Sequence, residues 1–147
     1  MLRKAILINF DIMKEPEPYI FEIELKVRDY ELDAEGIVNN ANYLHYLEFS
    51  RHEFCEKAGM SFSGMRSRGI DPVVSRIEID YMTPLRGSER FVSKLWLERK
   101  GPRFLFHQAI FTLDGKPVVK ADTTVVALEN GRLGRGEVLA ELFKDYI

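Results

Sequence analysis

A carboxylate and the expected start of a helix lie close together between residues 33 and 43. Asp33 belongs to a short acidic segment, and an asparagine-rich run (residues 39–42) follows it. The first N–H groups of a helix have no intrahelical acceptor and carry a partial positive charge, so they can hold a developing oxyanion. We therefore expect the amides of Asn40 and Ala41 to face a carbonyl group that Asp33 approaches from the other side. Such an arrangement suits acyl transfer.

Hydrophobic spacing predicts the elements that position these groups. A helical period runs over residues 42–58, and Gly59 is expected to end that helix. Its apolar face is expected to hold Tyr43, Leu47, Ser50, Phe54 and Ala58, and its polar face His45, Glu48, His52 and Glu56. Alternating apolar residues predict strands at 19–28, 73–81, 91–98, 103–113 and 117–128, and a short helix is expected near 138–143.

One strand, one long helix and four further strands predict an α+β domain over residues 19–147. A hairpin is expected at Asp114-Gly115, because that dipeptide suits a two-residue turn. Residues 1–18 contain a short apolar run followed by two prolines, so we expect them to form an N-terminal extension.

Composition limits the classes of function. With 147 residues, 46% hydrophobic residues and a net charge of −2, the chain is long enough for one core and predicts neither a nucleic-acid nor a membrane partner. Its apolar N-terminal run is too short for a signal-peptide core or a membrane span, so a cytoplasmic location is expected. The single cysteine, Cys55, excludes an internal disulfide and is expected to be a small buried side chain.

Several familiar reaction motifs are missing from the sequence. It has no Gly-x-Ser-x-Gly elbow, no Walker A motif and no dinucleotide-binding glycine pattern. His45 and His52 are seven residues apart, which is not the His-Glu-x-x-His spacing of a zinc protease. We therefore expect these two residues and His107 to be surface or packing residues, with no metal and no other cofactor.

The motif around Asp33 resembles a known family. Residues 33–38, followed by Asn42-Tyr43, Glu48 and Arg51, are similar to the 4-hydroxybenzoyl-CoA thioesterase-like family of hotdog-fold proteins. The longer pattern of residues 28–41 with 51–54 resembles the plant acyl-ACP thioesterases of the methylketone-synthase-2 type. The similarity spans roughly residues 20–128. It implies a hotdog fold, in which an antiparallel sheet wraps around one long central helix.

The resemblance also implies an activity, the hydrolysis of an acyl thioester carried on CoA or ACP. In the family, the residue that matches Asp33 is the nucleophile or general base, and the N–H near the position of Asn40 polarises the thioester carbonyl. Asn40 replaces the histidine of many bacterial members but agrees with the plant group. The chemistry is undemanding, because a thiol with a pKa of about 8.5 leaves readily as a thiolate.

The same resemblance assigns supporting positions. Glu48 and Arg51 match a family pair, which we interpret as a buried or interfacial ion pair. The residues expected to bind substrate or shape the pocket are Gly36, Val38, Asn42, Tyr43 and Arg86. Arg86, together with Arg66 and Arg68, is expected to meet the pantetheine phosphates.

Assembly and two other functions complete the expectations. Family members dimerise by joining their sheets, which implies a homodimer or a homotetramer with the site at a subunit interface. The first alternative function is a hotdog dehydratase or hydratase acting on 3-hydroxyacyl thioesters, which would require a histidine, and residues 33–42 contain none. The second is a non-catalytic acyl-binding module. The sequence leaves open the acyl chain length, the carrier and the choice between dimer and tetramer.

Overall fold

The computed structural model describes residues 18–147. Its elements, in chain order, are β1 (Phe21–Lys26), the 3-10 turn η1 (Asp29–Glu31), α2 (Asn40–Ala58), α3 (Phe62–Ser67), β2 (Ile70–Tyr81), β3 (Arg90–Lys100), β4 (Arg103–Thr112), β5 (Pro117–Glu129), β6 (Arg132–Leu133) and α4 (Glu137–Leu142). Each predicted element is present, with ends shifted by a few residues, and the structure also contains η1, α3 and β6.

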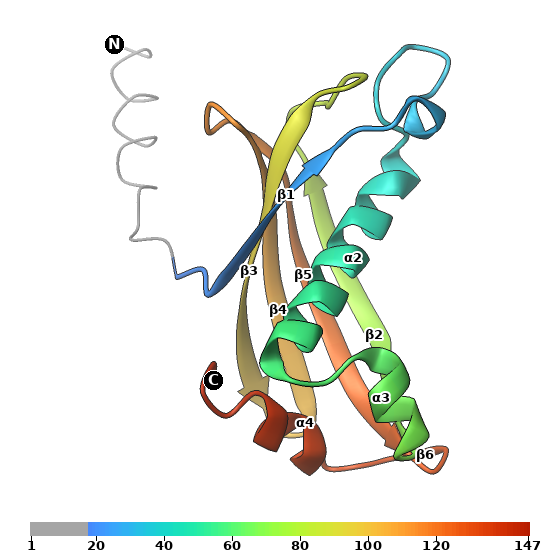
Figure 1. The fold of residues 1–147 in the computed structure, drawn as a ribbon, viewed down its shortest axis with the longest axis vertical. Helices are drawn as coiled ribbons and strands as arrows, with labels where there is room; N and C mark the ends of the chain where they lie inside the picture. Colours follow the sequence, from blue (N-terminus) through green and yellow to red (C-terminus); the bar gives the residue numbers. More distant parts are fainter. Residues whose placement is uncertain (1–17) are drawn as a thin grey trace.

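The strands form one antiparallel sheet in the order β1-β3-β4-β5-β2, and β6 pairs with β5. The sheet curves around α2, which crosses its inner face (Figure 1). This α+β architecture confirms the predicted hotdog fold. Strand β2 lies at the end of the strand order and pairs only with β5, so its other edge is unpaired within the described chain.

The β4–β5 connection is the hairpin that the sequence predicted. Gly115 has φ +88°, a left-handed conformation that glycine adopts without steric cost. The Gly115 N–H donates to the Thr112 carbonyl, and the Thr112 N–H donates to the Lys116 carbonyl. This turn places β5 beside β4 and so fixes the centre of the sheet.

The core between α2 and the sheet contains two apolar clusters. The first lies at the N-terminal end of α2 and includes Tyr43, Tyr46 and Leu47, while the second lies toward its C-terminal end and includes Phe54 and Phe143. Between them, buried polar side chains form what we call the polar layer: Ser50, Arg51, Ser93, Gln108 and Thr123. The predicted apolar face of α2 therefore packs inward as expected, with a polar band halfway along it.

The expectations for the N-terminal extension and for membrane-spanning segments can be compared only with residues 18–147. The predicted N-terminal extension, residues 1–18, lies outside the described residues except for Pro18. Within residues 18–147, no helix has both the length and the apolar character needed to cross a membrane.

Candidate active site

Asp33 lies in a tight loop, residues 32–38, which we call the Asp33 loop. The loop closes on itself, because Leu32 and Val38 form a β-bridge and the Asp33 N–H donates to the Ile37 carbonyl at 2.8 Å. Asp33 Oδ1 accepts the N–H of Glu35 at 2.8 Å and that of Ile37 at 3.4 Å. The side chain is half-buried, and within the described chain its Oδ2 accepts no hydrogen bond. The local folding of the loop thus uses one carboxylate oxygen and leaves the other available.

The start of α2 differs from the prediction by two residues. The helix begins at Asn40, and Asn39 is its N-cap: Asn39 Oδ1 accepts the Ala41 N–H at 3.0 Å, and the Asn39 carbonyl accepts the Asn42 N–H at 2.9 Å. The Asn40 N–H has no hydrogen-bond acceptor among residues 18–147. Of the two amides predicted to hold an oxyanion, Ala41 is therefore occupied by the cap, and Asn40 is the one that remains available.

The helix start and the chain before the Asp33 loop meet at one carbonyl group. The Glu31 carbonyl accepts the Asn39 N–H at 2.9 Å and Asn42 Nδ2 at 2.8 Å. The Glu31 side chain is buried, and its Oε1 accepts the Arg28 N–H at 2.7 Å. Asn42 thus contacts the backbone of η1, a link across eleven residues that its sequence position did not indicate.

The turn between β2 and β3 forms the other side of the helix start. The Leu85 carbonyl accepts the Val38 N–H at 2.9 Å, and the Leu85 N–H donates to Tyr43 Oη at 3.0 Å. Burial is the main cause that raises the pKa of Tyr43. Tyr81 Oη donates to the Asn40 carbonyl at 3.1 Å. Sequence reasoning missed Tyr81, because only the position of β2 brings it to the helix start.

The structure divides the residues predicted to bind substrate. Gly36 is exposed with φ +77° and shapes the turn of the Asp33 loop, while Val38 is buried in the apolar cluster near Tyr43. Arg86 is exposed and forms a β-bridge with Ile37, which places it beside the Asp33 loop.

Arg66 and Arg68 do not join Arg86 within one chain. They lie in or directly after α3, which follows the C-terminal end of α2, whereas Arg86 lies beside the loop at its N-terminal end (Figure 1). A helix of 19 residues is roughly 28 Å long. Within one chain, Arg66 and Arg68 thus lie apart from Arg86, and the contact of these arginines with pantetheine phosphates stays a prediction.

The predicted ion pair between Glu48 and Arg51 is not formed within the chain. Glu48 is exposed, and its Oε1 lies 3.6 Å from Nε2 of His52, whose pKa is lowered mainly by burial. Arg51 is buried against the sheet, where Nη1 donates to Gln108 Oε1 at 2.9 Å, and Gln108 Nε2 in turn donates to the Leu47 carbonyl at 3.0 Å. Burial is the main cause that lowers the pKa of Arg51. The two side chains separate because one position of α2 faces solvent and the other faces the polar layer.

The histidines and the cysteine lie outside this arrangement. His45 is exposed on α2, and the ring of His52 stacks on Phe62 at 3.9 Å. Cys55 is buried in the core, and burial raises the pKa of its thiol to about 12, which leaves it protonated and a poor nucleophile.

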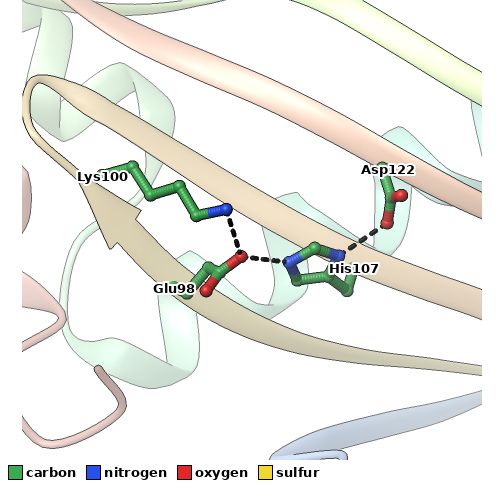
Figure 2. Close-up of polar contacts among 4 residues, drawn as sticks. All are labelled: Glu98, Lys100, His107 and Asp122. Atoms are coloured by element: carbon green, nitrogen blue, oxygen red, sulfur yellow. Dashed lines mark hydrogen bonds and ion pairs between the residues drawn. The ribbon is translucent and has the colours of Figure 1, made fainter.

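His107 lies on the outer face of the sheet, between two carboxylates (Figure 2). Its Nδ1 is 2.6 Å from Asp122 Oδ1, and its Nε2 is 2.9 Å from Glu98 Oε1. Lys100 Nζ approaches the same Glu98 oxygen at 3.5 Å, and the Trp96 ring stacks on the imidazole at 4.0 Å. The hydrogen bond from His107 holds the pKa of Glu98 below its usual range. This cluster joins β3, β4 and β5 and contacts neither the Asp33 loop nor the start of α2.

Comparison with known proteins finds a matching family model and several similar thioesterases. Residues 27–140 match the family model of the thioesterase-like superfamily. An acyl-acyl carrier protein thioesterase of Arabidopsis thaliana is 40% identical over 111 residues, which cover 74% of this chain and 59% of the plant protein. The chain thus spans less than two thirds of the length of that relative.

Bacterial proteins give similar matches. The long-chain acyl-CoA thioesterase FadM of Escherichia coli is 32% identical over 104 residues, which cover 71% of this chain and 78% of FadM. The crystal structure of a hypothetical protein from Aquifex aeolicus is 34% identical and superposes with a TM-score of 0.77, covering 83% of this chain and 98% of that one.

Proposed function

The chain belongs to the thioesterase-like superfamily, and we propose that it hydrolyses an acyl thioester carried on coenzyme A or on an acyl carrier protein. The observation that carries the proposal is the pairing of two available groups: the Oδ2 of Asp33, and the Asn40 N–H at the start of α2. Their segments are joined at the Glu31 carbonyl. The names of the plant and bacterial relatives support both carriers.

In the proposed reaction, the thioester carbonyl oxygen accepts the Asn40 N–H. Negative charge grows on that oxygen in the transition state, and a preorganised N–H with no competing acceptor stabilises it there. Asp33 acts either as the base that takes a proton from water, whose oxygen attacks the carbonyl carbon, or as the nucleophile that attacks this carbon itself. In both routes the carbon–sulfur bond breaks and the thiol leaves as a thiolate, which needs little help because its pKa is about 8.5. In the nucleophile route the acyl group is left on Asp33 as a mixed anhydride, and water hydrolyses it to the free acid and restores the carboxylate.

Two other functions require different surroundings. A dehydratase or hydratase of this family would use a histidine at the site, yet His52 and His107 lie elsewhere and no hydrogen bond joins His45 to the Asp33 loop within the described chain. A non-catalytic acyl-binding module would not require the free carboxylate oxygen of Asp33. The geometry therefore favours hydrolysis over both.

We also propose that the partner in solution is a second copy of the chain. Strand β2 has twelve residues, and one of its edges is unpaired within the described chain. Apolar side chains are exposed along it, with Val74 at 46% and Tyr81 at 47% of their maximum exposure. Proteins seldom leave a long apolar strand edge bare. Since Tyr81 contacts the first residue of α2, a partner that covers this edge would lie beside the site. An active monomer at micromolar concentration, measured by light scattering, would contradict this assembly.

The test is the release of free thiol from a chain-length series of acyl-CoA and acyl-ACP substrates, with Asp33→Asn beside the wild type. The asparagine Oδ1 can still accept the two loop amides, but the side chain cannot act as a base or nucleophile. We expect turnover to fall by roughly 10²–10⁴, the usual contribution of a positioned acid–base group. The matched control is Glu35→Gln, which changes an exposed carboxylate in the same loop.

Four results would reject the proposal. Near wild-type turnover by Asp33→Asn would show that Asp33 takes no part in the reaction. An equal loss of turnover in Glu35→Gln would show that only the negative charge of the loop matters. Conversion of 3-hydroxyacyl substrates without thiol release would identify a dehydratase, and binding without any reaction would identify an acyl-binding module.

A further inference from the structure

The Glu31 carbonyl is the point at which the helix start and the segment that leads into the Asp33 loop are joined. It lies two residues before Asp33, and its two donors, the Asn39 N–H and Asn42 Nδ2, lie on either side of Asn40. We propose that Asn42 is a positioning residue, which fixes the separation between the Asp33 carboxylate and the Asn40 N–H. The inference rests on the proposed function, because it assumes that these two groups act on one carbonyl.

The side chain of Asn42 is free for this role because a different residue caps the helix. Asn39 Oδ1 accepts the Ala41 N–H, and the Asn39 carbonyl accepts the N–H of Asn42 itself. The side chain of Asn42 instead reaches back to η1, where it is half-buried and donates at 2.8 Å. Because this bond runs to a backbone carbonyl outside the helix, it constrains the position of the first turn of α2 relative to η1.

Glu31 provides a fixed acceptor. Its carboxylate is buried and accepts the Arg28 N–H at 2.7 Å, and its own N–H donates to the Arg28 carbonyl at 3.0 Å. These contacts close η1 at both ends, so the Glu31 carbonyl has a defined direction.

Among residues 18–147, most of the other contacts of the helix start and of the Asp33 loop do not involve η1. The Asp33 loop is tied mainly to itself, through the Leu32–Val38 bridge, while Tyr43 and Val38 are hydrogen-bonded to Leu85 in the β2–β3 turn. Between residues 39–42 and η1, the hydrogen bonds within the described chain come from Asn39 and Asn42, and one turn further along α2 Tyr46 lies close to the Glu31 carboxylate. The Asn39 bond is part of the backbone bridge that closes the Asp33 loop, together with the bond from the Asp33 N–H to the Ile37 carbonyl. The Asn42 side chain, three residues further on, adds the bond that holds the first turn of α2 against η1.

Removing the Asn42 amide should therefore reduce turnover without weakening substrate binding. A displacement of about 1 Å between reacting groups can cost on the order of 10²-fold in rate. For Asn42→Ala we expect kcat to fall by roughly 10- to 100-fold, with KM nearly unchanged. Asn42→Leu, which keeps more of the side-chain volume, should behave alike, so one variant remains informative if the other folds poorly.

The decisive measurement is a double-mutant cycle with Asp33→Asn. If Asn42 acts by positioning Asp33, then Asn42→Ala should change the residual turnover of Asp33→Asn by less than about threefold, because there is no carboxylate left to misplace. The matched control is Ser67→Ala, which also removes a hydrogen bond from a side chain to a backbone carbonyl, that of Gly64, but in α3 beyond the other end of α2. It should leave the kcat of the folded protein unchanged.

Each possible outcome decides a different point. Equal losses from Asn42→Ala in the wild-type and Asp33→Asn backgrounds would overturn the positioning role and leave the proposed function intact. A rise in KM with kcat unchanged would also overturn it, because Asn42 would then be a substrate contact. Near wild-type turnover by Asp33→Asn alone would reject the role of Asp33, and this inference with it.

Discussion

Replacing Asn40 by proline would remove one backbone N–H and little else. Proline has no N–H, and the first position of a helix accepts it readily because the donor there has no intrahelical acceptor. The residue before a proline must be extended. Asn39 already meets this requirement, with φ −59° and ψ 135°. The Asn39 cap and the contact of Tyr81 with the Asn40 carbonyl both use other atoms. Asn40→Pro should therefore keep α2 and lose only the proposed oxyanion donor.

The expected loss is large because no neighbouring donor can replace the missing one. The Ala41 N–H is held by Asn39 Oδ1 at 3.0 Å, and the Asn42 N–H by the Asn39 carbonyl at 2.9 Å. Loss of one oxyanion donor typically reduces turnover by about 10²–10³, equivalent to roughly 2.7–4 kcal/mol of transition-state stabilisation. We expect Asn40→Pro to fall in this range. Asn40→Ala retains the N–H and should lose about threefold or less.

The assay is steady-state thiol release with the best thioester of the chain-length series, at matched folded concentrations established by circular dichroism and thermal melting. The reasoning would be refuted if folded Asn40→Pro turned over at close to the wild-type rate. If Asn40→Ala proved as harmful as Asn40→Pro, the side chain would be the active element and the amide would not.

Three further predictions concern the rest of the molecule. Val74→Lys, which places a charge on the exposed edge of β2, should convert a dimer to monomers by light scattering; an unchanged oligomer would exclude this edge as the interface. Because the hydrogen bond from His107 lowers the pKa of Glu98, the stability from this contact is present above the ordinary glutamate pKa of 4.5 and is lost as the pH falls through the lowered value. The melting temperature should therefore fall less steeply below about pH 4.5 in Glu98→Gln than in the wild type, and parallel curves would contradict this. Gln108→Leu leaves the buried Arg51 without its acceptor and should cost roughly 1.5–3 kcal/mol in urea unfolding, whereas a loss well below 1 kcal/mol would show that Arg51 finds another partner.

The helices and strands were predictable because their signals are local, whereas the hotdog arrangement was implied by the family resemblance. Alternation of period two reports a sheet with one buried face, and a period of 3.6 reports a helix with one buried face. The buried face predicted for α2 was correct at Tyr43, Leu47, Ser50 and Phe54. Strand ends were less certain: β2 begins at Ile70, three residues before the predicted start, because pairing with β5 extends it beyond the clear alternation.

The helix start shows why the details of the site were harder to predict. Asn39, Asn40 and Asn42 lie within four residues, and each is a favourable N-cap by residue type. The choice depends on which residue has extended φ and ψ while the next one is helical, and the structure assigns that position to Asn39. Once Asn39 caps the helix, the availability of the Asn40 N–H and the contact of Asn42 with Glu31 follow.

The error over Glu48 and Arg51 has a different origin. The pair was predicted because both residues match a family pair, and opposite charges three residues apart on a helix can contact each other. Arg51 instead contacts Gln108, 57 residues further along the chain. The register of β4 under α2 determines that contact, and the hydrophobic pattern does not reveal it, because Gln108 lies at an inward-facing position to which the alternation of β4 would assign an apolar residue.

The polar layer and the Glu31 carbonyl act on two different parts of α2, and together they fix where its first residue lies. A shift of the helix by one residue along its axis is a movement of about 1.5 Å. Such a shift would take Ser50 away from Ser93, with which it forms a 2.6 Å hydrogen bond, and Arg51 away from Gln108. Each buried polar group left without a partner costs about 1–3 kcal/mol, whereas apolar side chains can repack against their neighbours more cheaply. The layer therefore selects one axial position of α2, and since an error of about 1 Å at a reacting group can cost 10²-fold in rate, that selection matters for the proposed reaction at the Asn40 N–H.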